Sequence, residues 1–255
     1  MMRHNTTHDC NIGIYIIGDE ILSGKRQDGH LSKAIAILKA RGLQLSWAEY
    51  LGDDPARMVA SFKRSFAHSI SSGDIVFSFG GIGATPDDYT RQCAADAAGV
   101  PIERHAGAVA EIVAQFAEGA YPKRVIMAEF PQGADLIPNP VNRVAGFSIH
   151  SHYFVPGFPA MAHPMMEWVL DTNYAHLFHQ TEYLEQSIIV VDGIESQLID
   201  LMNMVIAQFD VKVFSLPKLK PNRQVELGAK GKPEQVMQAM QEIKVGVTAL
   251  GFTWQ

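Results

Sequence analysis

Cysteine is scarce in this sequence. Only Cys10 and Cys93 occur among its 255 residues, which is too few for a disulfide framework or a four-thiolate metal site. Long apolar runs are missing as well, since none approaches the roughly 18 residues that cross a bilayer. The first ten residues are polar and lack the apolar middle of a secretory signal. The sequence therefore predicts a cytoplasmic protein with no membrane partner.

Positive charge is also in short supply. The chain has 21 Lys and Arg against 27 Asp and Glu, for a formal net charge of -6. Non-specific binding of nucleic acid requires clustered cations that displace counterions, so this balance disfavours a nucleic-acid partner. Hydrophobic residues make up 47% of the chain, which is typical of a folded globular protein. The length suffices for one large α/β domain and a small second domain.

Apolar runs alternate with helical periodicity over the first hundred residues. Residues 12–17 and 75–79 predict buried strands, and a further strand is expected at 45–50. Helices are predicted from two apolar faces, Leu31, Ala34, Ile35 and Leu38 in the first and Met58, Phe62, Phe66 and Ile70 in the second, and from the helical character of 89–98. The second helix follows the N-cap signal Asp53-Asp54-Pro55. This alternation favours a parallel sheet with helices on both faces.

The pattern changes beyond Pro101. A helix is expected at 108–116, and strand candidates at 134–137, 145–150 and 153–155 would extend the sheet in antiparallel fashion. A rigid Pro-Gly turn at 156–159 precedes a helix near 165–170. We place a domain boundary near residue 175, with one domain over 10–175 and a small α+β domain over 176–255.

Two predicted strand ends carry candidate functional residues. Gly18-Asp19-Glu20 follows the first strand, and Gly80-Gly81-Ile82-Gly83 follows the strand at 75–79. In open α/β sheets ligands bind outside the carboxyl ends of the strands. Glycines there can turn several backbone N–H groups toward one phosphate, although many such loops carry glycine only to make a tight turn.

Carboxylates surround this proposed anion site. Asp19 and Glu20 belong to one strand end, and Asp87 and Asp88 follow the other. Four negative charges beside an anion are costly unless a divalent cation or hydrogen-bond donors compensate. The alternative is that Asp87 or Asp88 caps the following helix, and one acid could cap while the other faces the ligand.

An ordered set of motifs covers about residues 10 to 170. The set consists of Gly18-Asp19-Glu20-Ile21-Leu22-Ser23-Gly24, Leu51-Gly52-Asp53-Asp54, Gly80-Gly81-Ile82-Gly83-Ala84-Thr85-Pro86-Asp87-Asp88, Asn139-Pro140 and Pro156-Gly157-Phe158-Pro159. It resembles the molybdopterin-binding family of MoaB and Mog, and more closely the N-terminal domain of CinA, the competence/damage-inducible protein. The tail from Gln180 onward is similar to the small α+β domain that follows in CinA-like chains. The amidase domain of full-length CinA is absent, so deamidation of pyridine nucleotides is not expected.

The resemblance implies a three-layer α/β/α domain that binds a pterin or nucleotide phosphate. Relatives hydrolyse the pyrophosphate of ADP-ribose or FAD with a divalent metal such as Mg²⁺ or Co²⁺, and others adenylate molybdopterin. By this resemblance the ligand-binding residues are Gly18, Ser23, Gly24, Gly80, Gly81, Gly83, Ala84, Thr85, Pro156 and Gly157. The catalytic residues are Asp19, Glu20, His30 and Asp88, and the metal ligands are Asp87 and Asp88.

Three positions depart from the family pattern. The family usually has proline at Ala84, asparagine at His30 and glutamate near Met161. These changes could leave binding without turnover, or His30 could supply its own proton donor or base. We therefore weigh a metal-dependent nucleotide pyrophosphatase against a non-catalytic molybdopterin-binding module of molybdenum cofactor biosynthesis. A third hypothesis is an interaction protein that keeps the fold as a scaffold.

Two further expectations concern surfaces. Apolar residues over 145–155 and in the helix after Pro159 are expected to be exposed and to form a homo-oligomer, since relatives form dimers or trimers. His150 and His152 could share one strand face as metal ligands, but two ligands alone do not close a site, and we interpret them as surface residues.

Overall fold

The computed structural model describes residues 11–180, 183–218 and 223–255. The chain separates into two compact units, the first ending at Phe178 and the second beginning at His179. The sequence placed this boundary near residue 175. Among the described residues, no helix combines the length and the apolar character that a bilayer span needs.

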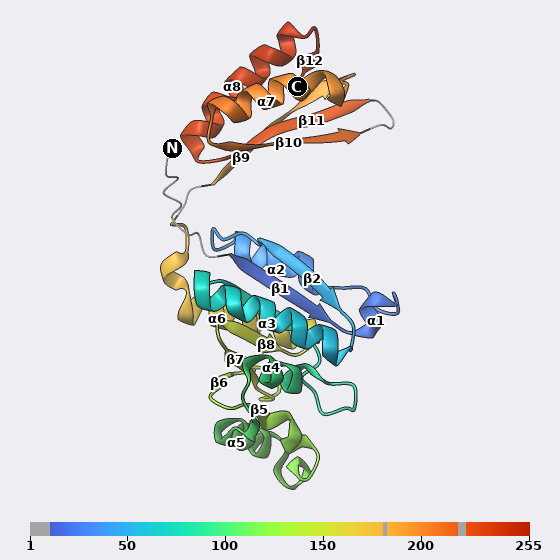
Figure 1. Cartoon of the computed structure of the whole chain (residues 1–255), viewed down its shortest axis with the longest axis vertical. Helices are drawn as coiled ribbons and strands as arrows, with labels where there is room; N and C mark the ends of the chain where they lie inside the picture. The colour runs from blue at the N-terminus through green and yellow to red at the C-terminus, as the bar shows by residue number, and fades with distance from the viewer. Residues whose placement is uncertain (1–10, 181–182, 219–222) are drawn as a thin grey trace. The chain divides into compact units, whose positions relative to one another are not determined.

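A six-stranded sheet forms the centre of the first unit (Figure 1). The strands run in the order β2-β1-β3-β8-β7-β6. They are β1 (Ile12–Ile17), β2 (Trp47–Leu51), β3 (Ile75–Phe79), β6 (Asp135–Ile137), β7 (Gly146–Ile149) and β8 (His152–Val155). The first four strands of this order are parallel, whereas β7 pairs antiparallel with both β8 and β6. The antiparallel extension predicted from the sequence is present.

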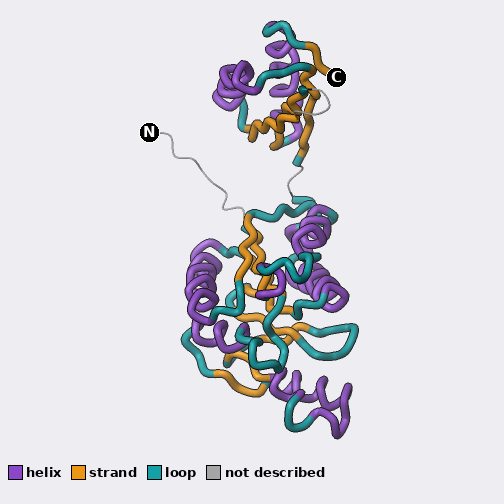
Figure 2. Tube along the Cα trace, turned by 90° about the vertical axis from the view of Figure 1, so that its right-hand side faces the viewer, coloured by secondary structure: helices purple, strands orange, loops and turns teal. Residues whose placement is uncertain are grey.

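Helices cover both faces of this sheet, as the edge-on view in Figure 2 shows. One face packs against α2 (His30–Lys39) and α6 (Pro159–Asn173), and the other against α3 (Pro55–Ser72), α4 (Thr90–Ala98) and α5 (Ala106–Phe116). The strands β1 and β3 are buried on both sides because their alternate side chains enter two separate cores. The fold is therefore the expected three-layer α/β/α arrangement.

Shorter elements complete the first unit. A one-turn helix, α1 (Asp19–Leu22), follows β1, and the small ladder of β4 (Ile102–Arg104) with β5 (Glu129–Pro131) flanks α5. Three 3₁₀ turns are η1 (Ala117–Ala120), η2 (Arg124–Ala128) and η3 (Ala175–Leu177). The sequence patterns did not predict β4, β5 or these turns, because each is too short to show a period.

The buried face of α3 includes the predicted Met58, Phe62 and Phe66 but not Ile70. Its ends are as expected, since the Asp54 carboxylate accepts the N–H groups that open the helix and Gly73 ends it in the left-handed conformation. However, Ile70 is 71% exposed. Each four-residue step along a helix overshoots one turn by about 40°, so a series of such steps drifts off the face. Serines 61, 65 and 69 are buried on this helix instead.

Two smaller differences concern the buried face of α2 and the start of β2. In α2 the residue Ile35 is 46% exposed, and Ile37 is buried in its place. The strand β2 begins at Trp47, where its pairing with β1 starts, and Leu45 packs against the core as part of the preceding loop.

The interpretation of His152 as a surface residue is wrong. His152 is fully buried in β8, with Nδ1 donating to the carbonyl oxygen of His150 at 2.9 Å and Nε2 lying 2.8 Å from the hydroxyl of Ser65. His150 has a positive φ of 50° in the turn before the strand, so the two rings do not share a strand face. A hydrophobic period alone does not reveal a buried polar partner such as Ser65 on a neighbouring helix.

This burial predicts a loss of stability in acid. Desolvation lowers the pKa of His152 from 6.5 to about 4. Below pH 6.5 this ring binds a proton in the unfolded chain, whereas in the folded chain it stays neutral down to about pH 4. The free energy of unfolding therefore falls as the pH drops through this window. The contribution is about 3 kcal/mol at 1.36 kcal/mol per pKa unit. Urea unfolding should show about 2 kcal/mol of this loss between pH 7 and pH 5, with the remainder lost on further acidification toward pH 4, and His152→Gln should reduce it. An NMR titration of the ring near its ordinary pKa would contradict the prediction.

The expected exposed apolar surface is not present over 145–155. Ala145, Phe147, Tyr153, Phe154 and Val155 are all buried within the sheet and its two cores. These residues were predicted to be exposed because the pattern showed an antiparallel edge and not the helices that cover it. The homo-oligomer expectation therefore loses this basis.

The second unit is an α+β module, as expected. Its sheet has the order β10-β11-β9-β12, with all neighbours antiparallel. The elements are β9 (Leu184–Val191), α7 (Glu195–Gln208), β10 (Val211–Lys218), β11 (Gln224–Gly231), α8 (Pro233–Ala249) and β12 (Thr253–Trp254). Both helices contribute to one apolar core with the sheet.

Candidate functional site

The loops after β1 and β3 lie side by side at the carboxyl edge of the parallel strands. The chain crosses from β1 to β2 through α2 on one face, and from β2 to β3 through α3 on the other. Crossovers that diverge in this way open a crevice where ligands of such sheets bind. A Cβ atom on Gly80 would overlap the carbonyl oxygen of Ile17, which shows how closely the two loops approach.

The turn at Pro156-Gly157 joins the same edge. Gly80 donates its N–H to the carbonyl oxygen of Val155 at 3.0 Å. A Cβ atom on Gly157 would lie 3.3 Å from the Cα of Gly80. Gly18 donates its N–H to the carbonyl oxygen of Leu51 at 3.0 Å, which ties the β1 loop to the end of β2.

The helix α4 holds three carbonyl groups of the glycine loop, defined as residues 80–84. Thr90 donates its hydroxyl to the carbonyl oxygen of Gly80 and its N–H to that of Gly81, each at 3.0 Å. Arg91 donates from Nη2 to the carbonyl oxygen of Gly83 at 2.6 Å. In a planar trans peptide the N–H points opposite to the preceding C=O. The N–H groups of residues 81, 82 and 84 therefore point away from α4.

These N–H groups have no acceptor among the described residues. Within the part of the chain that the structure describes, residues 81–84 donate no backbone hydrogen bond. Gly80 and Gly81 have positive φ values of 109° and 68°, which glycine adopts at little cost. Successive N–H groups that face one side form a concave anion site. The glycine loop is thus arranged to bind phosphate oxygens.

Arg91 lies beneath the glycine loop and is only 2% exposed. Its Nη1 donates to the carbonyl oxygens of Ile126 at 2.5 Å and Glu129 at 3.3 Å, so the same guanidinium ties the loop to η2 and β5. Its Nε has no partner among the described residues. Burial lowers the pKa of Arg91, while the nearby charges of Glu129 and Asp88 oppose this shift. A buried cation in this position adds positive potential under the loop.

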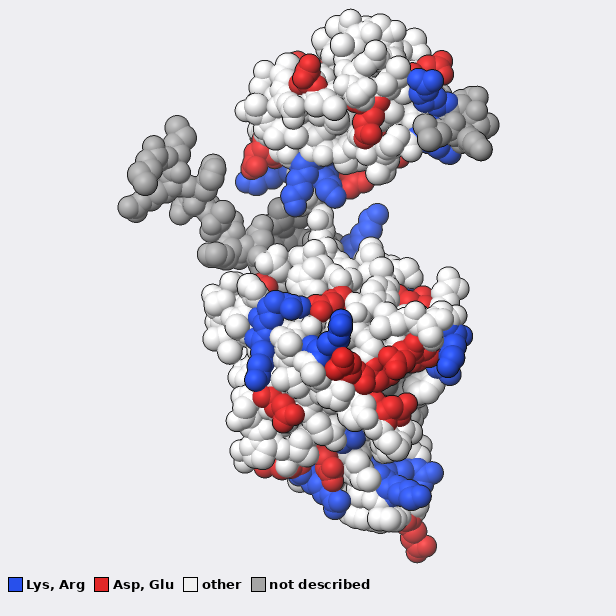
Figure 3. Space-filling model, turned by 45° about the vertical axis from the view of Figure 1, so that its right-hand side comes forward, with Lys and Arg blue, Asp and Glu red and all other residues white. Residues whose placement is uncertain are grey.

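Carboxylates form the rim of the site. Asp19 donates its N–H to Asp53 Oδ2 at 3.0 Å, and Asp53 donates its N–H to Asp19 Oδ1 at 3.2 Å. Burial raises the pKa of Asp53, and the charges of Asp19, Glu20 and Asp87 raise it further. The side of the first unit where α1 projects carries a band of acidic side chains in Figure 3. The predicted convergence of carboxylates from several loops is therefore present.

Neither Asp87 nor Asp88 caps α4. The residue before the helix is Tyr89, and no side chain accepts a capping bond there. The Thr85 hydroxyl instead lies 2.6 Å from Asp87 Oδ1 and 2.5 Å from Asp88 Oδ2, so that either carboxylate can accept its single proton, and the Thr85 N–H donates to Asp88 Oδ2 at 2.8 Å. The hydrogen bond from the Thr85 hydroxyl lowers the pKa of Asp87. Because its hydroxyl is engaged in this way, Thr85 would have to rotate before it could donate to a phosphate.

Comparison with known proteins identifies the family. A family model described as "Probable molybdopterin binding domain" matches residues 13–176. The chain belongs to this family. The match covers every element of the first unit from β1 to α6, including the glycine loop and its acidic rim. The molybdopterin-binding family thus accounts for the first unit.

Individual relatives agree with this assignment. A CinA-like protein of Anaeromyxobacter sp. (strain K) is 31% identical over 167 residues, which cover 62% of this chain and 40% of the relative. The chain therefore spans well under half the length of that relative. A protein of Saccharolobus islandicus (strain L.S.2.15 / Lassen #1) is 26% identical over 245 residues, 91% of this chain and 90% of its own. Among solved structures, CinA from Thermoplasma acidophilum matches with a TM-score of 0.56 and 26% identity, covering 63% of this chain and 97% of that chain.

His30, where the resemblance implied an asparagine, is buried behind the Pro156-Gly157 turn. It is 4% exposed, and its Nε2 donates to the carbonyl oxygen of Gly157 at 3.2 Å. Its ring stacks on Phe79 with centroids 4.6 Å apart. Burial lowers the pKa of His30, so the neutral form is favoured. In this position His30 holds the turn, and a catalytic role would require it to reach the ligand.

Some residues singled out from the sequence lie outside the glycine loop. Ser23 and Gly24 form an exposed turn after α1, and no hydrogen bond among the described residues joins them to the glycine loop. Met161 lies in the first turns of α6 and is partly buried. Ala84, by contrast, belongs to the glycine loop, is exposed and keeps a backbone N–H that a proline would lack.

A metal centre is not preformed. Within the described ranges, no group of three or more His, Cys, Asp or Glu side chains is arranged to hold a metal ion. The predicted ligands Asp87 and Asp88 are bonded to Thr85. Carboxylate oxygens suit hard divalent cations, but the carboxylate side chains of the described residues are not arranged to coordinate one ion together.

Sequence reasoning missed three residues of the site. Thr90 and Arg91 hold the glycine loop, and Asp53 links the β1 and β2 loops. Asp53 belongs to one of the recognised motifs and could have been included on that ground. Thr90 and Arg91 directly follow the acidic motif, but only the three-dimensional arrangement shows that they bind loop carbonyl groups.

Proposed function

We propose that the first unit binds the phosphate of a molybdopterin-type pterin or a nucleotide at the glycine loop. The observation that carries this proposal is the set of backbone N–H groups at residues 81–84, which have no acceptor in the part of the chain that the structure describes. Family membership supports a molybdopterin-related ligand. Backbone donors recognise the phosphate and leave the attached group undetermined, so the pterin and the nucleotide remain alternatives within one ligand chemistry.

The carboxylates of the acidic rim repel a bound phosphate, and nearby donors offset this repulsion. The N–H groups of the loop and the buried charge of Arg91 both favour negative charge. The Asp87 and Asp88 carboxylates are partly compensated by Thr85, and the Asp19 carboxylate by the N–H of Asp53. These donors lower the repulsion that a bound phosphate would experience.

A metal-dependent pyrophosphatase that acts on ADP-ribose or FAD is the second candidate. The proximity of the Asp53 carboxylate to those of Asp19, Glu20 and Asp87 is the observation in its favour, because a divalent cation placed between the carboxylates and a phosphate would relieve the repulsion among these acids. The described side chains do not form a metal-holding group, so we derive no hydrolytic step from their geometry.

Calorimetric titration of the full chain with AMP, ADP-ribose and adenosine tests the binding proposal. Both phosphate-bearing ligands should bind, and adenosine should bind at least tenfold more weakly, since hydrogen bonds to charged groups contribute about 1.5–3 kcal/mol. Ala84→Pro removes one N–H donor at an exposed position of the glycine loop, so it should fold and bind AMP about tenfold more weakly. Ala84→Gly keeps the N–H and should bind like the original chain. Equal affinity for AMP and adenosine would overturn the proposal.

The same samples separate the two candidate functions. With Mg²⁺, Co²⁺ or Mn²⁺ present, release of AMP from ADP-ribose or FAD would support the pyrophosphatase. Asp53→Asn retains an acceptor for the N–H of Asp19 but removes the charge, and it should abolish that release. Binding of the phosphate ligands without any AMP release, with or without metal, would support the non-catalytic module.

A further inference from the structure

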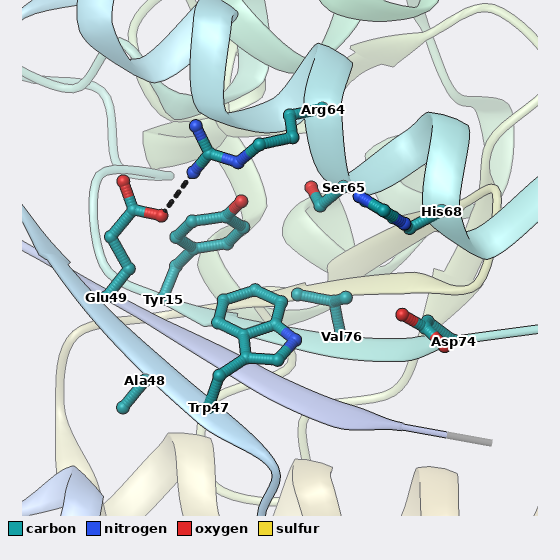
Figure 4. A pocket seen from close by; sticks show the side chains of 9 residues that line it. All are labelled: Tyr15, Trp47, Ala48, Glu49, Arg64, Ser65, His68, Asp74 and Val76. Atoms are coloured by element: carbon teal, nitrogen blue, oxygen red, sulfur yellow. Dashed lines mark hydrogen bonds and ion pairs between the residues drawn. The ribbon is translucent and has the colours of Figure 1, made fainter. Parts of the chain in front are cut away.

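A separate cavity opens at the other end of the sheet, between α3 and the edge strand β2. Its volume is about 380 Å³, which is within the range of small-molecule sites. Its walls include Trp47 at the start of β2, Asp74 just before β3, and Arg64 and His68 from the second half of α3 (Figure 4). The amino ends of the strands therefore bound this cavity, whereas the glycine loop lies at their carboxyl ends.

An indole ring forms the floor of the cavity. Trp47 packs directly over Gly13 of β1, where any Cβ atom would overlap the six-membered ring. Tyr15 contacts the indole edge to face, with ring centroids 5.1 Å apart. Figure 4 shows the indole between the strands and α3, with its nitrogen toward Val76. Gly13 thus makes room for a fixed aromatic platform on the sheet.

One pair of charges in the wall is already matched. Arg64 donates from Nη2 to Glu49 Oε2 at 2.6 Å, and the Ser61 hydroxyl donates to Glu49 Oε1 at 2.8 Å. The Glu49 carboxylate and the Arg64 guanidinium therefore offset each other. Neither group therefore presents an uncompensated charge to a ligand.

One acidic group in the wall is not matched by a cation. Asp74 is 7% exposed, and its Oδ1 accepts the backbone and side-chain N–H groups of Asn11, each at 3.3 Å. Within the described residues, Oδ2 accepts no hydrogen bond and no ion pair includes Asp74. Figure 4 shows this carboxylate at the end of the cavity below His68. A buried carboxylate next to an aromatic platform attracts a cation.

We propose that this cavity binds a small planar organic cation of the amidinium class, which lays its flat face on Trp47 and donates N–H groups to Asp74. A planar amidinium matches both features, because its N–H groups lie in the plane that stacks on the indole. The walls formed by α3 and by the strands leave no room for a bulky ligand, and the Asp74 carboxylate disfavours an anionic one. This site is independent of the phosphate site at the glycine loop.

Benzamidine is the probe, and benzamide is its uncharged counterpart of nearly the same shape. In an NMR titration of the full chain, benzamidine should shift the indole N–H signal of Trp47 and leave those of Trp168 and Trp254 unchanged, with Trp47→Phe used to assign the signal. Benzamide should bind at least tenfold more weakly. Asp74→Asn keeps an acceptor for Asn11 and should weaken benzamidine binding at least tenfold, whereas Asp135→Asn, at an exposed position of β6, should not.

Several results would overturn the proposal. They are the absence of a Trp47 shift at the highest soluble concentration of benzamidine, equal binding of benzamide, and an unchanged affinity in Asp74→Asn. Thermal unfolding of each variant without ligand confirms that the fold is kept. If Asp74→Asn unfolds, the comparison of benzamidine with benzamide on the original chain still decides the question.

Discussion

Replacing Arg91 with methionine is expected to weaken AMP binding about 100-fold and to lower the free energy of unfolding by about 2–5 kcal/mol. The substitution keeps an apolar stem of similar length but removes the donors that hold the carbonyl oxygens of Gly83, Ile126 and Glu129. Buried carbonyl groups without donors are costly, so the loop would rearrange. The N–H of Ala84 would then no longer be fixed away from α4, and the positive potential under the loop would be lost.

Two variants separate the role of Arg91 at the site from its role in the fold. Arg91→Lys keeps the charge but not the forked donor set, so AMP affinity should fall less than in Arg91→Met. Arg104→Met removes a half-exposed partner of the Glu129 side chain and should cost less than about 1 kcal/mol with no change in AMP affinity. Calorimetry with AMP and urea unfolding measure both effects. A folded Arg91→Met protein that binds AMP as tightly as the original chain would show that Arg91 is only structural.

The overall fold could be predicted because its signals are local. The strand at Ile12–Ile17 is a continuous apolar run, and α3 carries an acidic cap, a proline at its first position and a glycine at its end. The order of strands and helices then leaves few topologies open, since right-handed crossovers decide on which face each helix lies. That topology alone brings the ends of β1 and β3 together, so the convergence of the two loops was also predictable.

The buried polar residues could not be predicted from the periodicity of hydrophobic residues along the sequence. Buried serines on α3 face the sheet, and His152 bonds Ser65 across the gap between helix and strand. The residue type alone predicts that each of these residues is exposed, because the partner that satisfies its polar group is distant in sequence. The cavity floored by Trp47 could not be predicted for the same reason, since the indole that fills the space above Gly13 comes from another strand.

The details of the site depend on hydrogen bonds between distant segments. The sequence indicated that glycines could turn N–H groups toward a phosphate, but the carbonyl groups opposite them had to be held by something. That role falls to Thr90 and Arg91, which show no motif of their own. His30 illustrates the reverse case, because its residue type suggested proton transfer while its burial places it behind a turn.

Gly81→Ala is the second variant with a large expected effect, namely a loss of AMP binding of about 100-fold or more and a destabilisation of about 2–4 kcal/mol. The φ value of 68° at Gly81 lies in the left-handed region, and the added Cβ atom would overlap the hydroxyl of Thr90. Thr90 would then release the carbonyl oxygen of Gly80, which fixes the direction of the N–H of residue 81.

Gly99 provides the matched comparison for this variant. It lies at the other end of α4 with a φ of 71°, and a Cβ atom there meets nothing within 4 Å. Gly99→Ala therefore carries the same backbone strain without the collision, and it should cost only about 1 kcal/mol and leave AMP affinity unchanged. The difference between the two variants, measured by urea unfolding and calorimetry, isolates the contact with Thr90. Equal effects of the two substitutions on AMP affinity would mean that the conformation of the glycine loop does not control binding.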